Sequence, residues 1–410
     1  MERVLLIAVA KTNKERWHKI DALEELASLT ETAGGQVVER ILQIKENFDP
    51  ATLIAKGKLN EIKYLCHKHH IDLLIFENQL TATQIRNISE IVGVRIIDRT
   101  ALILDIFAQH AKTAEAKAQV ELAQLEYRLS NLIGYGNQLS RLGGGIGTRG
   151  PGERKLEIDR RHIRQRITIL RKTLAKIDKE RAVQRKNRQS FFKIALTGYT
   201  NAGKSTLMNS LTDANVKVAP YLFATLDANT KSLSLSKNIK VFITDTVGFI
   251  RNLPYELIAS FRSTLSEIKN ADLILHIIDT TDRNINEKIE AVNSTLCEIE
   301  CDNKPILLVF NKIDQIFEVE IIKRLKRQYP KAVFISAQSG EGIENLKQVI
   351  MNFVKSSLTI KTFSIPQNRG DLINIIYENC EVIKRVENNS AITLKVRGYK
   401  TVLNKLAKLY

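Results

Sequence analysis

Eight residues from Gly198 to Ser205, GYTNAGKS, have the spacing G-x-x-x-x-G-K-S/T, which suits a loop that wraps phosphates. The apolar stretch Phe191–Thr197 comes directly before them, and the stretch Ser205–Leu211 is expected to open a helix. In such a loop the backbone N–H groups and the helix N-terminus bind phosphate charge. We expect Lys204 to neutralise the β- and γ-phosphates and the hydroxyl of Ser205 to ligate Mg²⁺. The strand, loop and helix context favours a nucleoside triphosphate site over a chance match.

The tetrapeptide Asn311–Asp314, NKID, indicates which base is bound. It follows directly after the apolar stretch Ile306–Phe310. The carboxylate of Asp314 offers two oxygens matched to the N1–H and the exocyclic amine of guanine, and adenine lacks this pair of donors. We expect Lys312 to lie along the plane of the base and Asn311 to brace the phosphate loop. The motif therefore favours GTP over ATP.

A second tetrapeptide, ISAQ at Ile335–Gln338, follows another predicted strand. Its backbone N–H groups, chiefly that of Ala337, are expected to contact guanine O6. Either tetrapeptide alone is a weak signal. Because the two occur in this order after the phosphate loop, together they strongly favour a guanine nucleotide.

Two further segments are expected to respond to the γ-phosphate. DTVG at Asp245–Gly248 ends the apolar stretch VFITD, and we expect Asp245 to hold Mg²⁺ through water and the N–H of Gly248 to contact the γ-phosphate. FATLD at Phe223–Asp227 supplies Thr225 as the second hydroxyl ligand of the metal. Segments that are ordered only by the γ-phosphate and Mg²⁺ act as switches and relax after hydrolysis.

Two positions near the predicted phosphates bear on the rate of hydrolysis. Phe249 stands directly after DTVG, where small signalling GTPases carry a glutamine that orients the attacking water. An aromatic ring cannot do this by hydrogen bonding, so we expect slow intrinsic hydrolysis that a bound partner accelerates. Asn201 is the residue that some K⁺-activated GTPases use to hold potassium, but an asparagine is also typical of turns, and both interpretations are open.

The predicted nucleotide site thus draws on five separate loops. Its predicted catalytic residues are Lys204, Thr225 and Gly248, and its predicted metal ligands are Ser205 and Thr225. The residues predicted to contact the nucleotide are Gly198, Tyr199, Thr200, Asn201, Ala202, Gly203, Lys204, Ser205, Thr206, Phe223, Ala224, Thr225, Leu226, Asp227, Asp245, Thr246, Val247, Gly248, Asn311, Lys312, Ile313, Asp314, Ser336, Ala337 and Gln338.

A second glycine-rich stretch, SRLGGGIGTRGPGERK at Ser140–Lys155, is a rival candidate for binding phosphates. It follows a predicted helix rather than a strand and lacks the G-K-S/T ending, so we do not expect it to hold a nucleotide. Its bare N–H groups and flanking cations instead suit a narrow cavity lined by RNA phosphates. The predicted RNA-binding residues are Arg141, Arg149, Arg154, Lys155, Arg160, Arg161, Arg164 and Arg166.

The elements around this stretch predict an antiparallel helical hairpin. Ala118, Leu122, Leu125, Leu129 and Leu132 recur at alternating spacings of four and three residues, and a second stripe runs from Leu156 to Ile177. The second helix is strongly basic, because residues 153–188 contain 14 Lys and Arg against five Asp and Glu. A solvated helix face is the plain alternative to an RNA-binding one.

The remaining elements predict an α/β protein. The first hundred residues alternate apolar runs with amphipathic stretches, which indicates a small α/β domain with a mostly parallel sheet. Residues 189–358 are expected to form a doubly wound P-loop GTPase domain. The expected domains are 1–108, a small α/β domain; 109–188, the helical hairpin; 189–358, the GTPase domain; and 359–410, a small α+β module with the order strand, helix, strand, strand, helix.

The composition indicates a polyanionic partner. The 410 residues include 62 Lys and Arg against 45 Asp and Glu, a formal charge of +17. Such an excess favours nucleic acid, and an anionic membrane surface is the competing interpretation. The four cysteines form no C-x-x-C pair, and no apolar run approaches the ~18 residues of a membrane span, which favours a cytoplasmic protein.

Three long stretches resemble the HflX family of translational GTPases. They are DTVGFIRNLPYELIASFRSTLSEIKNADLILHIIDTTD, RIIDRTALILDIFAQHAKTAEAKAQVELAQLEYRLSNL and GGGIGTRGPGERKLEIDRRHIRQRI. The resemblance covers nearly the whole chain. It implies an N-terminal domain with a helical hairpin and a GTPase domain, in a protein that binds the large ribosomal subunit and its ribosomal RNA and splits or rescues stalled ribosomes, often under stress. We also expect the protein to be a monomer. Ala55 stands where the family usually has glycine, but no departure removes a predicted phosphate, metal or guanine ligand.

Two other functions remain open at this point. A ribosome-assembly or RNA-chaperone factor would use GTP as a checkpoint without splitting ribosomes. A membrane-surface GTPase would use the basic helix to bind anionic lipids, although that helix carries no bulky aromatic residues.

Overall fold

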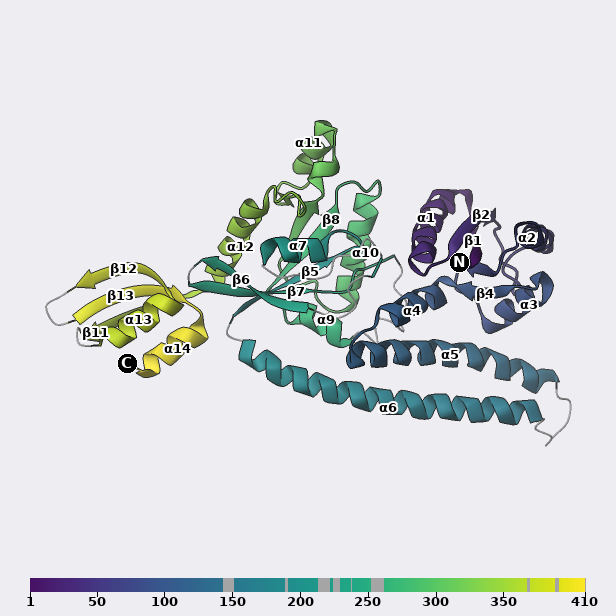
Figure 1. Ribbon diagram of the computed structural model, residues 1–410, viewed down its shortest axis with the longest axis horizontal. Helices are drawn as coiled ribbons and strands as arrows, with labels where there is room; N and C mark the ends of the chain where they lie inside the picture. Colours follow the sequence, from purple (N-terminus) through teal and green to yellow (C-terminus); the bar gives the residue numbers. More distant parts are fainter. Residues whose placement is uncertain are drawn as a thin grey trace. The chain divides into compact units, whose positions relative to one another are not determined.

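A computed structural model describes most of the chain, which folds into two compact units. The described residues are 1–142, 151–188, 191–212, 222–223, 229–236, 238–251, 262–366, 369–387 and 391–409. The first unit comprises Met1–Ile177 with Tyr221–Phe223 and Pro254–Phe261, and the second comprises Asp178–Pro220, Ala224–Leu253 and Arg262–Tyr410. Figure 1 labels the elements in chain order.

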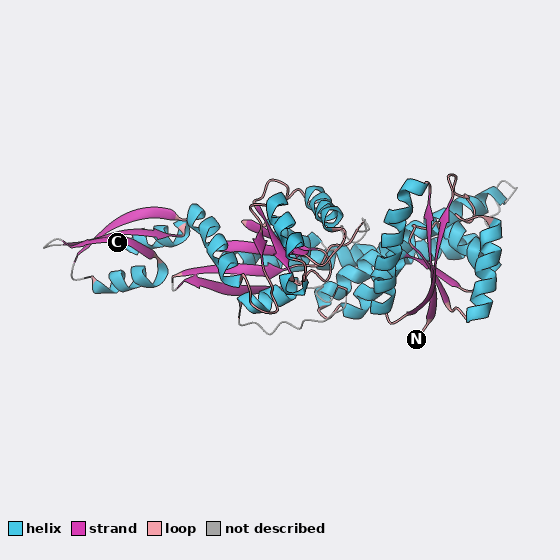
Figure 2. Ribbon diagram, turned by 90° about the horizontal axis from the view of Figure 1, so that it is seen from above, coloured by secondary structure: helices cyan, strands magenta, loops and turns pink. Residues whose placement is uncertain are grey.

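The first unit contains a parallel sheet with the strand order β2-β1-β3-β4. Its strands are β1 (Arg3–Ala10), β2 (Gln36–Ile44), β3 (Leu73–Phe76) and β4 (Arg95–Asp98). Its helices are α1 (Arg16–Thr32), α2 (Lys56–His69), α3 (Ala82–Val92) and α4 (Arg99–His110), and the short 3-10 helix η1 spans Asn13–Glu15. Figure 2 shows helices on both faces of this sheet, which agrees with β3 being apolar throughout and β1 being apolar after Arg3. The predicted parallel α/β arrangement is confirmed.

A long antiparallel hairpin follows, made of α5 (Ala114–Leu142) and α6 (Pro151–Arg188). Ala118 and Leu122 of α5 pack on Ile167 and Leu170 of α6, and the flanking leucines and Ile163 extend the seam. These are the residues of the two predicted stripes, which meet because their heptad spacing keeps one face of each helix apolar. Residues 143–150, which carry most of the glycine-rich stretch, lie outside the described residues.

The second unit is built on a larger sheet with the order β10-β9-β8-β5-β7-β6, in which only the β6–β7 pairing is antiparallel among the described strands. The strands are β5 (Phe192–Gly198), β6 (Asn229–Ser236), β7 (Ile239–Asp245), β8 (Leu273–Asp279), β9 (Ile306–Asn311) and β10 (Val333–Phe334). The helices are α7 (Lys204–Leu211), α9 (Arg262–Lys269), α10 (Ile285–Glu298), α11 (Val319–Gln328) and α12 (Ile343–Ser357), and η2 is a 3-10 helix at Ile313–Gln315.

This second sheet brings the sequence motifs to one edge. Strands β5, β7, β8 and β9 run parallel, so their carboxyl ends lie together. The phosphate loop follows β5, DTVG follows β7 and NKID follows β9. In doubly wound sheets the crevice at the carboxyl ends of the strands is the ligand site. The architecture therefore confirms the predicted P-loop GTPase fold.

The chain ends in a small module of β11 (Thr359–Pro366), α13 (Gly370–Asn379), β12 (Glu381–Glu387), β13 (Ala391–Gly398) and α14 (Lys400–Leu409). The strands form an antiparallel sheet with the order β11-β13-β12. Phe363 and Leu394 of the sheet pack on Leu372 and Ile376 of α13 and on Leu403 of α14. The order strand, helix, strand, strand, helix is the one that the sequence predicts.

Candidate nucleotide-binding site

Two glycines of the loop between β5 and α7 occupy positions that exclude a side chain. Gly198 has φ 146°, and a Cβ there would lie 2.2 Å from the carbonyl oxygen of Ile277. Gly203 has φ 93°, and a Cβ there would lie 2.2 Å from Nδ2 of Asn311. Asn201 adopts a left-handed φ of 61°, a conformation that asparagine tolerates. The loop thus curves tightly over the sheet edge, and its glycines leave the backbone bare for a ligand.

Lys204 lies buried at the centre of this loop. Its Nζ donates to the carbonyl oxygens of Gly198, at 3.2 Å, and Tyr199, at 2.9 Å. Burial lowers the pKa of Lys204 to about 8, while the nearby carboxylate of Asp245 acts in the opposite direction. Among the described residues the hydrogen bonds of this ammonium go to neutral carbonyls, and a buried cation held in this way attracts an anion.

Ser205 and Asp245 lie together at the start of α7 and the end of β7. The Ser205 hydroxyl donates to Oδ2 of Asp245 at 2.6 Å. A hydroxyl and a carboxylate are hard oxygen donors of the kind that Mg²⁺ prefers beside phosphates, so these residues fit the predicted metal. The described residues contain no cluster of three or more His, Cys, Asp and Glu that could form a separate metal centre. Thr225, the other predicted ligand, lies outside the described residues.

Backbone hydrogen bonds join the segment Thr246–Arg251, which follows β7, to the phosphate loop. The N–H of Phe249 donates to the carbonyl oxygen of Gly198 at 3.0 Å, and the N–H of Thr200 donates to the carbonyl oxygen of Phe249 at 2.8 Å. A Cβ on Gly248 would lie 2.8 Å from Cγ2 of Thr200, so no side chain fits there without a shift. The ring of Phe249 is 2% exposed and belongs to the protein interior. Phe249 therefore supports the loop instead of facing the reaction.

Tyr199 makes a further contact between the phosphate loop and the segment after β7. Its hydroxyl accepts a hydrogen bond from the N–H of Arg251 at 2.8 Å. The ammonium of Lys288 lies 4.6 Å from the centre of the Tyr199 ring, and Arg251 pairs with Glu287 of α10 at 2.7 Å. The sequence did not predict a role for three of these residues, Arg251, Glu287 and Lys288, because no motif marks contacts between α10 and the phosphate loop.

Asn311 connects the phosphate loop to the segment ISAQ, Ile335–Gln338, which we call the guanine loop. Its Nδ2 donates to the carbonyl oxygen of Ala202 at 2.9 Å, which is the bracing role expected of it. Its Oδ1 accepts the N–H of Ala337, also at 2.9 Å. That N–H is the group predicted to contact guanine O6. Contact with O6 therefore requires Ala337 to share or exchange this bond.

The other residues of NKID lie beside an acidic partner that the motif does not reveal. Lys312 has φ 65° and its Nζ pairs with Oδ2 of Asp279 at 2.6 Å. Asp279 is the last residue of β8 and lies at the same sheet edge as NKID. Asp314 lies on η2 and is exposed, so its carboxylate is accessible to a base.

The remaining predicted contacts divide into four groups. Thr246 is buried and donates to the carbonyl oxygen of Leu196 at 2.7 Å, which makes it structural. Phe223 is 3% exposed and its ring lies 4.5 Å from that of Phe107, within the first unit. The predicted contacts Ala224, Thr225, Leu226 and Asp227 lie outside the described residues. Thr206, Val247, Ile313, Ser336 and Gln338 lie on the described parts of the same loops or next to them.

The predicted RNA-binding arginines of α6 fall into two classes. Arg160 donates to the carbonyl oxygen of Leu132, and Arg166 forms a two-pronged ion pair with Glu121 at 2.6 and 2.9 Å. Arg161 and Arg164 are exposed, and their side chains have no hydrogen bond or ion pair with the described residues. Arg141 lies near the end of α5, Arg154 and Lys155 lie near the start of α6, and Arg149 lies outside the described residues.

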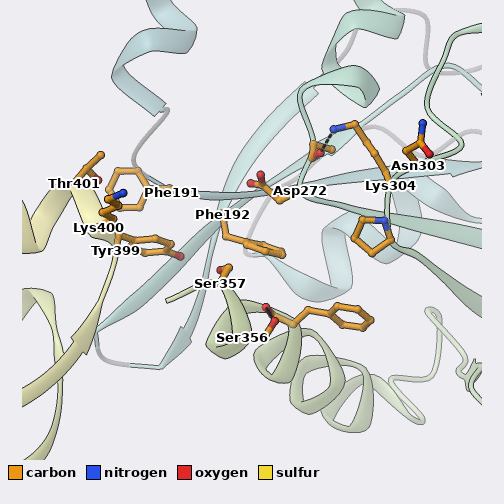
Figure 3. Close-up of a pocket in the computed structure, with 13 residues that line it drawn as sticks. Phe191, Phe192, Asp272, Asn303, Lys304, Ser356, Ser357, Tyr399, Lys400 and Thr401 are labelled. Carbon is orange, nitrogen blue, oxygen red and sulfur yellow. Dashed lines mark hydrogen bonds between the residues drawn. The ribbon is translucent and has the colours of Figure 1, made fainter. Parts of the chain in front are cut away.

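A cavity of about 620 Å³ lies at the other edge of the second sheet, at the amino ends of its strands. Figure 3 shows Phe192, Asp272 and Lys304 on one side of it and Tyr399 of the C-terminal module on another. Lys304 donates to the carbonyl oxygen of Ala271 at 2.7 Å, and Asp272 accepts the N–H of Lys193 at 2.8 Å. Because the phosphate loop, DTVG and NKID lie at the carboxyl ends of the strands, this cavity is not the predicted nucleotide site.

Models of four known families match consecutive parts of the chain. "GTP-binding GTPase N-terminal" matches residues 20–108 and "GTP-binding GTPase Middle Region" matches residues 110–188. "50S ribosome-binding GTPase" matches residues 193–312, and "HflX C-terminal domain" matches residues 320–407. Among the described residues, no helix is both long and apolar enough to cross a membrane.

Several proteins are similar to the chain over most of its length. The GTPase HflX of Caldanaerobacter subterraneus subsp. tengcongensis is 43% identical over 396 residues, which cover 96% of this chain and 90% of that protein. The GTPase HflX of Escherichia coli is 40% identical over 385 residues, which cover 92% and 90% respectively. The crystal structure of a GTP-binding protein from the archaeon Sulfolobus solfataricus in complex with GDP is 28% identical, covers 87% of this chain and 99% of its own, and has a TM-score of 0.43.

Proposed function

We propose, on the premise that this chain belongs to the HflX family of GTPases, that it binds the large ribosomal subunit and couples GTP hydrolysis to ribosome splitting or rescue of stalled ribosomes. As a member of that family it is a GTPase, which converts GTP and water to GDP and phosphate. The observation that supports a ribosomal role is the pairing of a guanine site with a basic helical hairpin in one chain. The family description of residues 193–312, a 50S ribosome-binding GTPase, agrees with this role.

In the proposed mechanism the triphosphate enters the curve of Gly198–Ser205. Phosphate oxygens are stronger acceptors than carbonyls, so the Nζ of Lys204 transfers its hydrogen bonds to them. Asp314 binds the guanine edge, while Asn311 keeps the guanine loop and the phosphate loop in register. Ser205, Asp245 and Thr225 would hold Mg²⁺, which supplies charge neutralisation at the β- and γ-phosphates.

The water that attacks the γ-phosphate needs an orienting group. Phe249 supplies none, because its ring is buried and its backbone is committed to the phosphate loop. We therefore propose that the ribosome contributes the missing group or orders a neighbouring segment, so that hydrolysis follows attachment. Potassium held near Asn201 is a further proposal, tested by comparing turnover in potassium and sodium salts.

The hairpin is the proposed RNA-binding element. Half of the excess charge of the chain lies on α6, and phosphate contacts of this kind make binding steeply dependent on salt. The glycine-rich stretch Ser140–Lys155 is proposed to enter a narrow cavity of ribosomal RNA. We further propose a cytoplasmic monomer, for which the ribosome is the assembly partner.

Light scattering of intact ribosomes tests this function directly. Mixing ribosomes with the protein and GTP is expected to lower the scattered intensity as subunits separate, and the variant Lys204→Met is expected to leave it unchanged. An assembly or RNA-chaperone factor would bind large subunits without lowering the scattering of intact ribosomes. That outcome would replace the proposed function with the alternative.

A further inference from the structure

In the described part of the chain no helix covers one face of the C-terminal sheet, which we call the bare face. Helices α13 and α14 lie on the same side of β11, β13 and β12, as Figures 1 and 2 both show. Along β13 the buried residues Ile392, Leu394 and Val396 face these helices. Because side chains alternate along a strand, Thr393, Lys395 and Arg397 face the opposite side.

The strand register places two lysines directly opposite each other on the bare face. Lys384 of β12 pairs with Lys395 of β13, and Thr362 of β11 pairs with Lys395 from the other side. Both lysines are exposed. Like charges at directly opposed positions destabilise a sheet, so this pair opposes folding instead of assisting it. Neither lysine forms an ion pair with any acidic side chain in the described part of the chain.

The nearest acidic residue on this face, Glu381, already lies against two other cations. Glu381 of β12 pairs with Arg397 at 3.2 Å and lies 3.8 Å from Lys355 of α12. Residues 359–410 as a whole contain nine Lys and Arg against four Asp and Glu. The bare face also carries the hydroxyls of Thr362, Ser364 and Thr393 and the exposed apolar side chains of Ile360 and Val386. Because Arg397 is balanced by Glu381, the net positive charge of the face comes from Lys384 and Lys395.

We propose that this bare face, centred on Lys384 and Lys395, binds the phosphate backbone of ribosomal RNA as a second contact, separate from the hairpin. The proposal rests on the ribosomal role proposed above. Lysine, serine and threonine are among the side chains that contact phosphate oxygens in nucleic-acid complexes. The described residues of the face include no aromatic side chain on which a base could stack, so the contact follows backbone charge and carries no base preference. The bound phosphates also remove the repulsion between the two lysines.

The test compares two double variants that remove the same charge from the same module. K384Q/K395Q removes the opposed pair, and K400Q/K405Q removes two exposed lysines of α14, on the helical side. Each variant is measured for co-sedimentation with purified large subunits at several salt concentrations. K384Q/K395Q is expected to weaken binding about tenfold and to lower the slope of log affinity against log salt by about 1.5, since each phosphate contact accounts for roughly 0.7–0.9 of slope. K400Q/K405Q and the GTP turnover of both variants without ribosomes are expected to match the unmodified protein.

A second arm separates this proposal from the ribosomal role. Binding to a short labelled RNA hairpin is measured by fluorescence anisotropy for the same variants. If the unmodified protein binds no large subunits, the ribosomal role fails, and the RNA hairpin still reports whether Lys384 and Lys395 contact phosphates. Equal binding and equal salt slopes for K384Q/K395Q and the unmodified protein in both arms overturn the proposal.

Replacing Thr393 with a photo-crosslinking amino acid identifies whether the bare face contacts RNA or protein on the large subunit. Crosslinks to ribosomal RNA support the proposal. Crosslinks confined to a ribosomal protein overturn it, because the face would then recognise an acidic protein surface.

Discussion

The side-chain amide of Asn311 holds the phosphate loop by donating to the carbonyl oxygen of Ala202 at 2.9 Å, while its own oxygen accepts the N–H of Ala337. One residue thus fixes the separation between the loop that binds phosphates and the loops that bind the base. We expect Asn311→Asp to weaken GDP and GTP binding about 10- to 100-fold, because a carboxylate cannot donate to Ala202 and adds negative charge near the phosphates. Titration with a fluorescent guanine nucleotide measures this loss. An unchanged affinity in a folded variant would show that the brace is dispensable.

Phe249 offers a second test, because its position is that of a water-orienting glutamine in other GTPases. Since the ring is 2% exposed, Phe249→Gln buries an amide and loses aromatic packing. We expect the free energy of unfolding to fall by about 2–4 kcal/mol and intrinsic GTP turnover not to rise. Phe249→Leu is the control, with a smaller loss of stability. A glutamine variant that is stable and hydrolyses GTP several times faster would contradict the structural role.

The sequence predicts most of the order of strands and helices, and it predicts the loops of the site, because both leave clear patterns. The stripe through Leu122 and Ile167 repeats with a heptad spacing, and the positions of Gly198 and Gly203 demand a residue without a side chain. The antiparallel edge strand β6 escaped because its sequence, NTKSLSLS, is too polar to signal burial. The ion pair of Lys312 with Asp279 escaped because only the folded sheet brings these residues together.

The two classes of arginine on α6 predict different effects on ribosome binding. Arg161 and Arg164 are exposed without a partner in the described residues, whereas Arg166 and Arg171 pair with Glu121 and Glu126. We expect R161Q/R164Q to lower the salt slope of large-subunit binding by about 1.4–1.8. R166Q/R171Q removes the same charge and is expected to change binding less and to lower stability only slightly, because exposed ion pairs contribute little. Equal loss of binding in both variants would show that total charge, and not these positions, matters.

The four cysteines predict a simple pattern of chemical protection. Cys297 is exposed, whereas Cys66, Cys301 and Cys380 are buried. Burial raises the pKa of Cys66 and of Cys380 to about 11. Near pH 8 their thiols therefore stay protonated and unreactive, and the fraction of reactive thiolate rises only as the pH approaches 11. We expect iodoacetamide to modify Cys297 first in the native protein and all four after unfolding, as read by mass spectrometry. Because Cys380 lies in the core of the C-terminal module, its protection also reports whether K384Q/K395Q is folded. Early labelling of Cys380 in the unmodified protein would contradict the packing described for this module.

GTP turnover measured with and without purified large ribosomal subunits tests the central claim most directly. The claim is that this GTPase site is completed by the large subunit, because Phe249 leaves the attacking water without an orienting group. We predict slow turnover alone and an increase of at least about tenfold with saturating large subunits, an acceleration that is lost at high salt. Turnover that is the same with and without large subunits, under conditions where the two co-sediment, would contradict the account.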